Sequence, residues 1–274
     1  MTRPAEQDAR EPASAVRKAL GMLDAFSASS PELSIRELAR RSGVARSTAH
    51  RLVGELLEWG ALERTPGGVR LGVKLFELGH LAPTSVTLRE AALPYAHHLH
   101  EVTQLTVNVA MRGGADIVYV EKISSRALRV PHSRQGGRGA LHATGLGKAI
   151  LAFSDADIVD DVAAGPLTAL TPKTIVDPVA LRAELDRVRQ QRIAYDVEES
   201  RLGLFCVAAP ILDPRGRALG AISVTGATQL HEAQRFAPAV STTALAVAGA
   251  LRPSRSGKQE EARQPELVAT RKIT

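Results

Sequence analysis

Apolar residues recur at helical spacing through about the first 60 residues of the chain. In each of three segments the spacing is three or four residues, which places the apolar side chains on one face of a helix. The predicted inward faces are Val16, Leu20 and Leu23 in the first helix, Ile35, Leu38 and Ala39 in the second, and Leu52, Leu56 and Trp59 in the third.

The second predicted helix has recognisable residues at both ends. Ser34 and Glu37 have the spacing of a capping box, in which each side chain binds a free backbone N–H at the helix start. Gly43 follows Ser42 and suits the left-handed conformation that ends a helix. Because the third helix begins shortly afterwards, at about Ala45, the pair predicts a helix-turn-helix.

A β-hairpin is predicted directly after the third helix. Gly60 ends that helix, and two short alternating runs, 61–64 and 69–71, flank a Thr-Pro-Gly-Gly turn at 65–68. Three helices followed by a hairpin predict a winged helix-turn-helix over residues 13–72, preceded by a disordered arm at residues 1–12.

The pattern changes after residue 72. A short helix at 73–81 and a boundary at Pro83 predict a linker helix over residues 73–86, followed by a helix at 87–101. Strands are then predicted at 105–111, 117–123, 193–196, 205–212 and 219–225, and helices at 145–153, 155–163, 178–192 and 231–251. This order predicts an α+β domain with a mostly antiparallel sheet at residues 87–251, and the charged, aperiodic residues 252–274 predict a disordered tail.

Arginine is concentrated around the predicted third helix. The 274-residue chain has a formal net charge of +6, and five arginines lie between residues 36 and 51 against one acid, Glu37. We expect Arg46 and Arg51 at guanine edges or phosphates, and Arg36 with the wing at the DNA backbone. The candidate DNA-contacting residues are Arg36, Arg46, Ser47, Thr48, His50, Arg51, Arg64 and Arg70. A solvated helical bundle and a winged helix that binds protein are the alternatives.

The remaining composition favours a reducing compartment. The single cysteine, Cys206, excludes an intrachain disulfide. The first 14 residues lack the apolar core of a signal peptide, and no apolar run approaches the roughly 18 residues that span a bilayer. We therefore expect a cytoplasmic protein without a membrane partner.

Motifs for catalysis and metal binding are incomplete. Gly145–Lys148 is similar to the end of a phosphate-binding P-loop, but His142 and Ala149 stand where that motif has Gly and Ser or Thr. His97 and Glu101 share a predicted helix face, but no zinc-type spacing is met. The sequence contains neither G-x-S-x-G nor H-E-x-x-H. We expect no catalytic residue, no metal and no cofactor.

From about Ser14 to Leu251 the sequence resembles the isocitrate lyase regulator (IclR) family of bacterial transcription factors. The N-terminal similarity lies in LSIRELARRSGVARSTAHRLVGELLEWGALER. Sharper similarities follow in LHATGLGKAILAF (141–153), YDVEESRLGLFCVAAPILD (195–213) and GAISVTG (220–226). The resemblance implies a winged helix, a linker helix and a GAF- or PAS-like effector domain, acting as a homodimer or tetramer on double-stranded operator DNA. It also implies a response to a small organic or aromatic acid.

The same resemblance implies an effector pocket formed by Gly145, Leu146, Asp196, Cys206, Ser223 and Thr225. The residue pattern agrees, because strand alternation places Ser223 and Thr225 on one face with Ala221. Gly145 and Gly147, at a predicted helix start, have N–H groups that can hold a carboxylate. The alternatives are an ordinary core strand and, at Cys206, a small buried hydrophobe.

Acidic residues near this predicted pocket bear on the charge of the effector. Asp196, Glu198 and Glu199 would repel an anion unless they are protonated or paired. Arg129, Arg134 or Arg138 could supply a counter-charge, and a neutral effector is the alternative.

Together these features predict a ligand-responsive DNA-binding transcription regulator that binds a palindromic operator, with repression favoured over activation. The alternatives are a winged-helix protein-interaction module and a metabolite-binding enzyme with an accessory DNA-binding domain.

Overall fold

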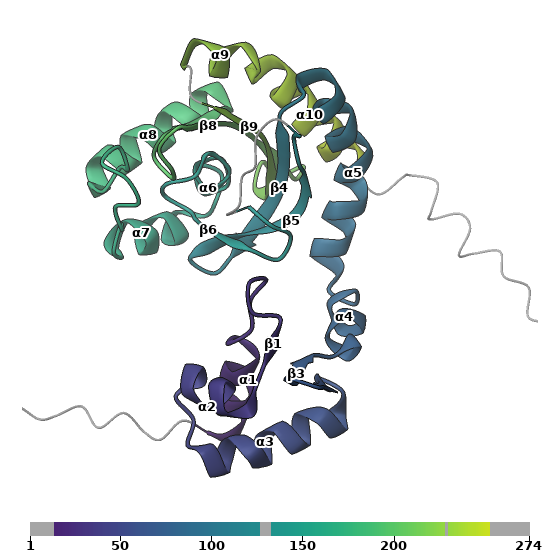
Figure 1. The fold of residues 1–274 in the computed structure, drawn as a ribbon. Helices are drawn as coiled ribbons and strands as arrows, with labels where there is room; N and C mark the ends of the chain where they lie inside the picture. Colours follow the sequence, from purple (N-terminus) through teal and green to yellow (C-terminus); the bar gives the residue numbers. More distant parts are fainter. Residues whose placement is uncertain (1–13, 127–132, 228–229, 253–274) are drawn as a thin grey trace, which may run out of the picture. The chain divides into compact units, whose positions relative to one another are not determined.

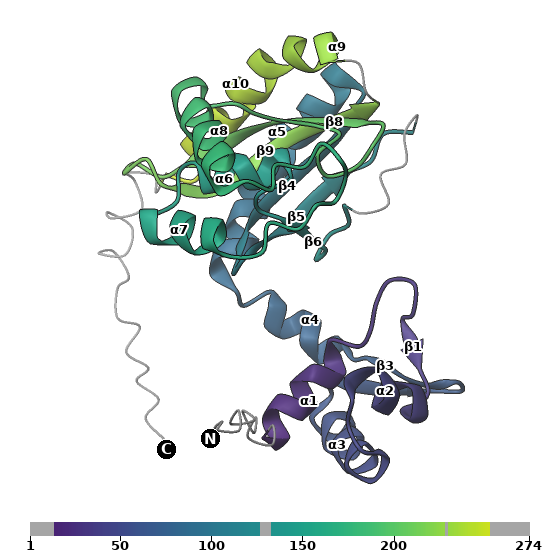
Figure 2. The same ribbon diagram turned by 90° about the vertical axis from the view of Figure 1, so that its left-hand side faces the viewer.

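The chain folds into two compact units that divide between Pro83 and Thr84 (Figures 1 and 2). The structure, a computed structural model, describes residues 14–126, 133–227 and 230–252. The arm predicted at residues 1–12 lies outside the described residues, as does the tail predicted at 252–274 apart from its first residue.

The first unit begins with three helices, α1 (Ala15–Leu23), α2 (Ile35–Ser42) and α3 (Arg46–Trp59). The Ser34 hydroxyl oxygen accepts a hydrogen bond from the N–H of Glu37 at 3.2 Å, and Gly43 ends α2 with a φ of 66°. The predicted helix-turn-helix is therefore confirmed. The capping box is only half formed, because the Glu37 carboxylate accepts hydrogen bonds from Arg40 and Arg41 instead.

A three-stranded antiparallel sheet completes this unit. Strands β2 (Leu62–Thr65) and β3 (Gly68–Leu71) form the predicted hairpin, and α4 (Val73–Gly79) follows it. Strand β1 (Glu32–Leu33), which pairs with β3, was not predicted, because two residues are too few to show an alternating pattern. Gly68 has a φ of 147°, and a side chain there would lie 2.2 Å from the Leu33 carbonyl oxygen, so only glycine fits this close approach.

Two of the predicted inward faces are wrong in part. Val16 and Leu20 of α1 are 69% and 57% exposed, and Met22 lies in the core instead. Trp59 is 53% exposed, although Leu52 on the same helix is buried as predicted. Helix α1 carries apolar side chains on more than one side, and periodicity alone does not decide which side is covered.

The second unit is built on a six-stranded antiparallel sheet with the order β6-β5-β4-β9-β8-β7. Its strands are β4 (Thr106–Gly113), β5 (Asp116–Ile123), β6 (Arg138–Ala140), β7 (Ala194–Val197), β8 (Leu204–Leu212) and β9 (Ala218–Ala227). Central strands β4 and β9 place Asn108 opposite Ser223 and Thr106 opposite Thr225. The predicted α+β class with a mostly antiparallel sheet is confirmed.

Helices cover both faces of this sheet, and the sheet separates two hydrophobic cores (Figures 1 and 2). Helices α5 (Pro83–Thr103) and α10 (Ala237–Ala250) pack on one face, and α6 (Gly145–Leu151) with α8 (Pro178–Gln191) packs on the other. Along β9, Ala221 belongs to the core beneath α6 and Ile222 to the core beneath α5 and α10. Ser223 and Thr225 therefore share the α6 side of the sheet with Ala221, as predicted.

The remaining helices correct two predicted bounds. Helix α7 (Ala156–Ala164) matches its prediction closely, but the predicted closing helix at 231–251 is two helices, α9 (Leu230–Arg235) and α10. Pro238 lies in the first turn of α10, where its missing N–H is tolerated and a continuous helix is not. Helix α5 begins at Pro83, earlier than predicted, because proline is tolerated in the first turn of a helix. Among the described residues, no helix has the length and apolar character needed to cross a membrane.

Candidate functional site

The start of α3 presents hydrogen-bond donors to solvent. Ala45 precedes the helix and provides no side-chain cap, so the backbone N–H groups of the first turn keep their capacity to donate. No acidic residue lies in that turn, so the positive end of the helix dipole is not neutralised there. Arg46, Ser47 and His50 are exposed, and Thr48 is half-buried. This arrangement suits a phosphate or a base edge.

Two arginines of helix α2 already form ion pairs with a glutamate of the same helix. Arg40 and Arg41 each contact the Glu37 carboxylate at 2.7 Å. The hydrogen bonds from Arg40 and Arg41 lower the pKa of Glu37 to about 2, so this carboxylate stays charged over the whole physiological range. These two guanidinium groups are less available to DNA than their positions in the sequence indicate.

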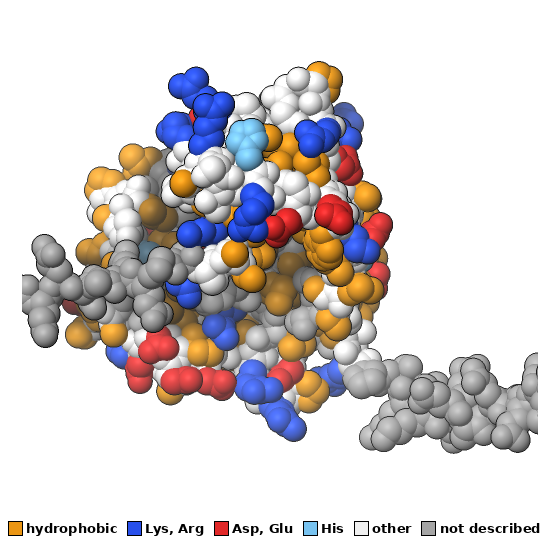
Figure 3. Space-filling view, turned by 90° about the horizontal axis from the view of Figure 1, so that it is seen from below, with side chains coloured by type: hydrophobic (Ala, Val, Ile, Leu, Met, Phe, Trp, Pro, Cys, Tyr) orange, Lys and Arg blue, Asp and Glu red, His pale blue; other side chains and the backbone are white. Residues whose placement is uncertain are grey.

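The arginines among the eight candidate DNA-contacting residues also differ in whether they form ion pairs. Arg51 pairs with Glu55 at 2.5 Å, and Arg70 pairs with Glu63 at 2.9 Å. Within the described parts of the chain, no ion pair involves Arg36, Arg46 or Arg64. In the view from below, where α3 is nearest to the viewer, Lys and Arg side chains gather around one histidine (Figure 3).

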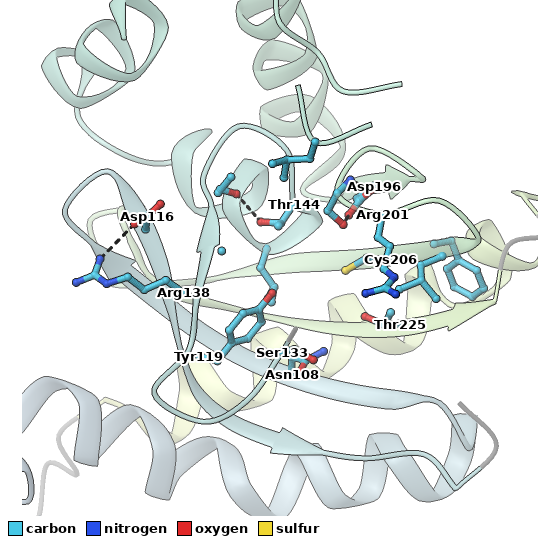
Figure 4. Close-up of a pocket in the computed structure, with 17 residues that line it drawn as sticks. Asn108, Asp116, Tyr119, Ser133, Arg138, Thr144, Asp196, Arg201, Cys206 and Thr225 are labelled. Atoms are coloured by element: carbon cyan, nitrogen blue, oxygen red, sulfur yellow. Dashed lines mark hydrogen bonds and ion pairs between the residues drawn. The ribbon is translucent and has the colours of Figure 1, made fainter. Parts of the chain in front are cut away.

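The second unit contains a cavity of about 470 Å³ between the sheet and α6 (Figure 4). Four of the six predicted effector residues line it, namely Leu146, Asp196, Cys206 and Thr225. The structure adds Asn108, Tyr119, Ser133, Arg138, Arg201 and Phe205 to the lining. The size and the mixture of apolar walls with a few polar groups are those of a small-molecule site.

Two predicted effector residues do not line the cavity. Ser223 is fully buried, and a side chain at Gly145 would lie 3.1 Å from the Cys206 sulfur. The N–H of Gly147, which we expected to be free for a carboxylate, is donated to the Thr144 hydroxyl at 2.9 Å. Both glycines serve close packing of α6, and effector binding by Gly145 and Ser223 remains a prediction.

Asp196 anchors the loop at residues 198–203, which joins β7 to β8 at the edge of the cavity. One carboxylate oxygen accepts hydrogen bonds from the N–H groups of Glu199 and Ser200, at 2.8 and 3.1 Å, and the other accepts from the Ser200 hydroxyl. Burial raises the pKa of Asp196, and these hydrogen bonds oppose the rise. The predicted pocket acid is thus also a structural support.

A buried lysine lies behind this loop. The Lys148 side chain is 1% exposed and contacts Glu199 at 2.5 Å and Glu184 at 3.3 Å. Burial raises the pKa of Glu199 to about 7, although Lys148 lowers it. Glu198 pairs with Lys173. The acids that we expected to repel an anion are therefore bonded within the protein, and Lys148 is not exposed as a P-loop lysine would be.

Cys206 lines the cavity as a neutral thiol. Burial, followed by the charge of Asp196, raises the pKa of Cys206 to about 11. At neutral pH the residue is therefore not a thiolate, the form that acts as a nucleophile. Its contribution is a small, polarisable wall.

The lining residues that were not predicted differ in the signal that their positions in the sequence offer. Asn108 interrupts a β-branched run in a central strand, and an uncharged polar residue at such a position is a usable signal. Arg201 lies in a loop, whose path the sequence pattern does not set. Of the three candidate counter-charges, Arg138 lines the cavity, Arg134 does not, and Arg129 lies outside the described residues.

Comparison with known proteins places both units in one family. The IclR helix-turn-helix domain matches residues 15–66, and the C-terminal domain of the bacterial transcriptional regulator IclR matches residues 80–249. The transcriptional regulator XynR of Escherichia coli K12 is 33% identical over 216 residues, which cover 78% of this chain and 86% of XynR. The transcriptional repressor IclR of the same strain is 30% identical over 214 residues, covering 76% of this chain and 78% of IclR.

Solved structures agree with these matches. The crystal structure of an IclR homologue from Microbacterium hydrocarbonoxydans, complexed with 4-hydroxybenzoate, has a TM-score of 0.80 and 25% identity. The similarity covers 88% of this chain and 100% of that chain. A regulator from Silicibacter sp. TM1040 has a TM-score of 0.75 and 30% identity, covering 87% and 96%. The winged helix, the cavity-bearing second unit and these similarities together show that the chain belongs to the IclR family of bacterial transcriptional regulators.

Proposed function

We propose that this regulator is a repressor that binds a palindromic operator as a homo-oligomer and changes its operator affinity when a small organic acid enters the cavity. The observation that carries the proposal is the cavity, which holds unbonded polar groups in the same chain as a winged helix-turn-helix. The 4-hydroxybenzoate complex of the Microbacterium homologue and the repressors among the relatives support it.

The start of α3 is the proposed base-contacting segment. Arg46 is exposed and has no ion pair within the described residues, so it can bind guanine or phosphate without first losing a partner. Arg51 must exchange Glu55 for DNA. An exposed ion pair contributes only about 0–1 kcal/mol, so a phosphate or a guanine edge can replace it.

Exposed apolar side chains support self-association of the first unit. Val16 and Leu20 on α1 and Val73 and Phe76 on α4 are all more than half exposed. A second copy that covered these side chains would remove apolar surface from water. A symmetric dimer would place two copies of α3 on half-sites about 34–36 Å apart, which is why a palindromic operator is proposed.

The effector is proposed to act by linkage between the two units. A ligand changes DNA affinity only if it binds two arrangements of the protein with different affinity. Helices α4 and α5 join the units in sequence and are the proposed coupling segment. Acid binding without a differential effect on DNA affinity would contradict a regulatory cavity.

Operator binding tests the DNA half of the proposal. Fluorescence anisotropy with DNA from upstream of the gene would compare the wild type with the double variant Arg46→Ala/Arg51→Ala. We expect the double variant to lose specific binding and to keep its thermal unfolding midpoint. Arg215→Ala removes an exposed arginine of the second unit and serves as the control, which should retain wild-type affinity. Operator affinity that survives the double change would show that the base contacts lie elsewhere.

An acid screen tests the effector half. Small aliphatic and aromatic acids would be added to the operator complex, and thermal shift would record direct binding. We expect one class of acid both to raise the unfolding midpoint and to change the operator affinity. A complex that no acid alters would contradict the proposed effector class.

No catalytic activity and a cytoplasmic location are part of the same proposal. The curated relatives are transcriptional regulators, and the Cys206 thiol is protonated at neutral pH. A repressor must also reach the chromosome. Chromatography of the recovered ligand would detect conversion of an acid that binds the cavity. Such conversion would contradict the proposed absence of catalytic activity.

A further inference from the structure

We infer that the cavity selects carboxylic acids that also carry a hydroxyl group, with Arg201 binding the carboxylate and Asn108 and Ser133 binding the hydroxyl. The inference rests on the proposed function, in which an organic acid occupies the cavity. It adds the groups that decide which acid is bound.

Arg201 is the available cation of the two arginines at the cavity. Arg138 is held by Asp116 at 3.4 Å and donates a hydrogen bond to the Gly113 carbonyl oxygen at 2.7 Å. Arg201 has no ion pair within the part of the chain that the structure describes. Its guanidinium points into the cavity, toward Thr225 and Cys206, whereas Arg138 is turned toward Asp116 (Figure 4). Arg201 is therefore the arginine of the lining that can bind an anion without first losing a partner.

The backbone around Arg201 is held in place on both sides. The preceding residues are bonded to Asp196 through the N–H groups of Glu199 and Ser200. On the far side, the N–H of Gly203 donates to the Glu198 carboxylate at 2.8 Å. Because the loop is fixed at these points, binding an anion need not order the backbone that carries Arg201.

Asn108 and Ser133 are the unsatisfied polar groups of the lining. Asn108 is 2% exposed and Ser133 is 3% exposed, and both line the cavity. The side-chain oxygen of each forms no hydrogen bond within the described residues. Buried polar atoms are nearly always bonded, so a partner supplied by a ligand explains both.

The chemistry of these two groups favours a hydroxyl. The Asn108 oxygen only accepts hydrogen bonds, and a carboxylate cannot donate one. A ligand hydroxyl can donate to Asn108 and accept from the Ser133 hydroxyl at the same time. Leu146, Phe205 and the ring of Tyr119 supply apolar wall in the same cavity, which suits a ring or a short carbon chain.

Three related ligands separate the two contacts. Isothermal titration would compare 4-hydroxybenzoate with benzoate, which lacks the hydroxyl, and with methyl 4-hydroxybenzoate, which lacks the charge; the 2- and 3-hydroxy isomers would cover other hydroxyl positions. For the wild type we expect the best hydroxybenzoate to bind about tenfold more tightly than benzoate, as one satisfied hydrogen bond allows. We expect the ester to bind about 10- to 100-fold more weakly than its acid, as loss of a charged contact allows.

Each variant should abolish one of these two differences in ligand affinity and leave the other unchanged. Arg201→Ala should abolish the preference for acid over ester and keep the preference for hydroxybenzoate over benzoate. Asn108→Ala should do the reverse. Arg215→Ala is the control, because it removes an exposed arginine that does not line the cavity, and both preferences should persist. If Asn108→Ala fails to fold, Ser133→Ala removes a single oxygen and tests the same preference.

Several results would overturn the inference. They are equal binding of benzoate and every hydroxybenzoate, an acid preference that survives Arg201→Ala, and no binding of any of these probes to the wild type. Operator affinity of the acid-free protein, measured on the same preparation, separates this failure from failure of the proposed function. Conversely, binding with the expected pattern but without any effect on operator affinity would support the inference and contradict the proposed switch.

Discussion

Replacing Glu199 by Gln should flatten the dependence of the second unit's stability on pH. Glu199 is largely buried and contacts Lys148, and burial raises its pKa from 4.5 to about 7. Glutamine keeps the size and the capacity to accept a hydrogen bond from Lys148, but it does not titrate.

The sign and size of the effect follow from proton linkage. Between pH 4.5 and about 7 the folded unit holds a proton on Glu199 that the unfolded chain has released. The contribution of Glu199 to the free energy of unfolding is therefore greatest below pH 4.5 and decreases as the pH rises through about 7. At about 1.36 kcal/mol for each pKa unit, the shift from 4.5 to about 7 corresponds to a complete loss of about 3 kcal/mol. The variant should lack this contribution. Between pH 5 and pH 8 the free energy of unfolding of the wild type should therefore fall by about 2–3 kcal/mol relative to that of the variant.

The aromatic residues allow the two units to be followed separately. Trp59 is the only tryptophan and belongs to the first unit, whereas Tyr95, Tyr119 and Tyr195 all belong to the second. Urea unfolding would be followed by tyrosine fluorescence in a Trp59→Phe background, and by tryptophan fluorescence in the natural sequence. Only the tyrosine-detected transition should differ between Glu199→Gln and its parent. Parallel pH curves for variant and parent would refute the reasoning, as would an equal change in the tryptophan-detected transition.

Four further outcomes test other parts of the structure. Gly147→Ala would place a side-chain carbon 2.4 Å from the Leu141 carbonyl oxygen, so it should destabilise the second unit by about 1–3 kcal/mol or more in urea unfolding. Gly249→Ala, which meets nothing within 4 Å on α10, should be neutral or stabilising by up to about 1 kcal/mol. Ser34→Ala removes the cap of α2 and should lower the tryptophan-detected stability by about 1 kcal/mol; an unchanged midpoint would show that the cap contributes nothing. Cys206 should resist iodoacetamide at pH 8 in the folded protein, because a pKa of about 11 leaves about one thiol in a thousand ionised; labelling as fast as in urea would contradict its burial.

The sequence alone determined the features that depend on neighbours in the chain. The cap at Ser34, the left-handed turn at Gly43 and the hairpin after Gly60 each need only a few consecutive residues to be specified. The face shared by Ser223 and Thr225 follows from the period of two along a single strand. The family resemblance added the identity of the cavity region, where four of six expected residues line the observed cavity.

The tertiary structure decided which of these local features face each other. Periodicity could not show that Val16 and Trp59 are exposed, because an apolar stripe does not specify whether a partner covers it. The ion pair between Arg51 and Glu55 depends on the side-chain rotamers that the folded helix adopts. It distinguishes Arg51 from Arg46, which has no ion pair within the described residues.

The cavity itself brings together Asn108 from β4, Ser133, and Arg201 from the loop between β7 and β8. Their meeting depends on strand order and loop path, which are set by packing between residues far apart in the sequence. The helix-turn-helix therefore follows from local chemistry, whereas the specificity of the cavity follows from non-local packing.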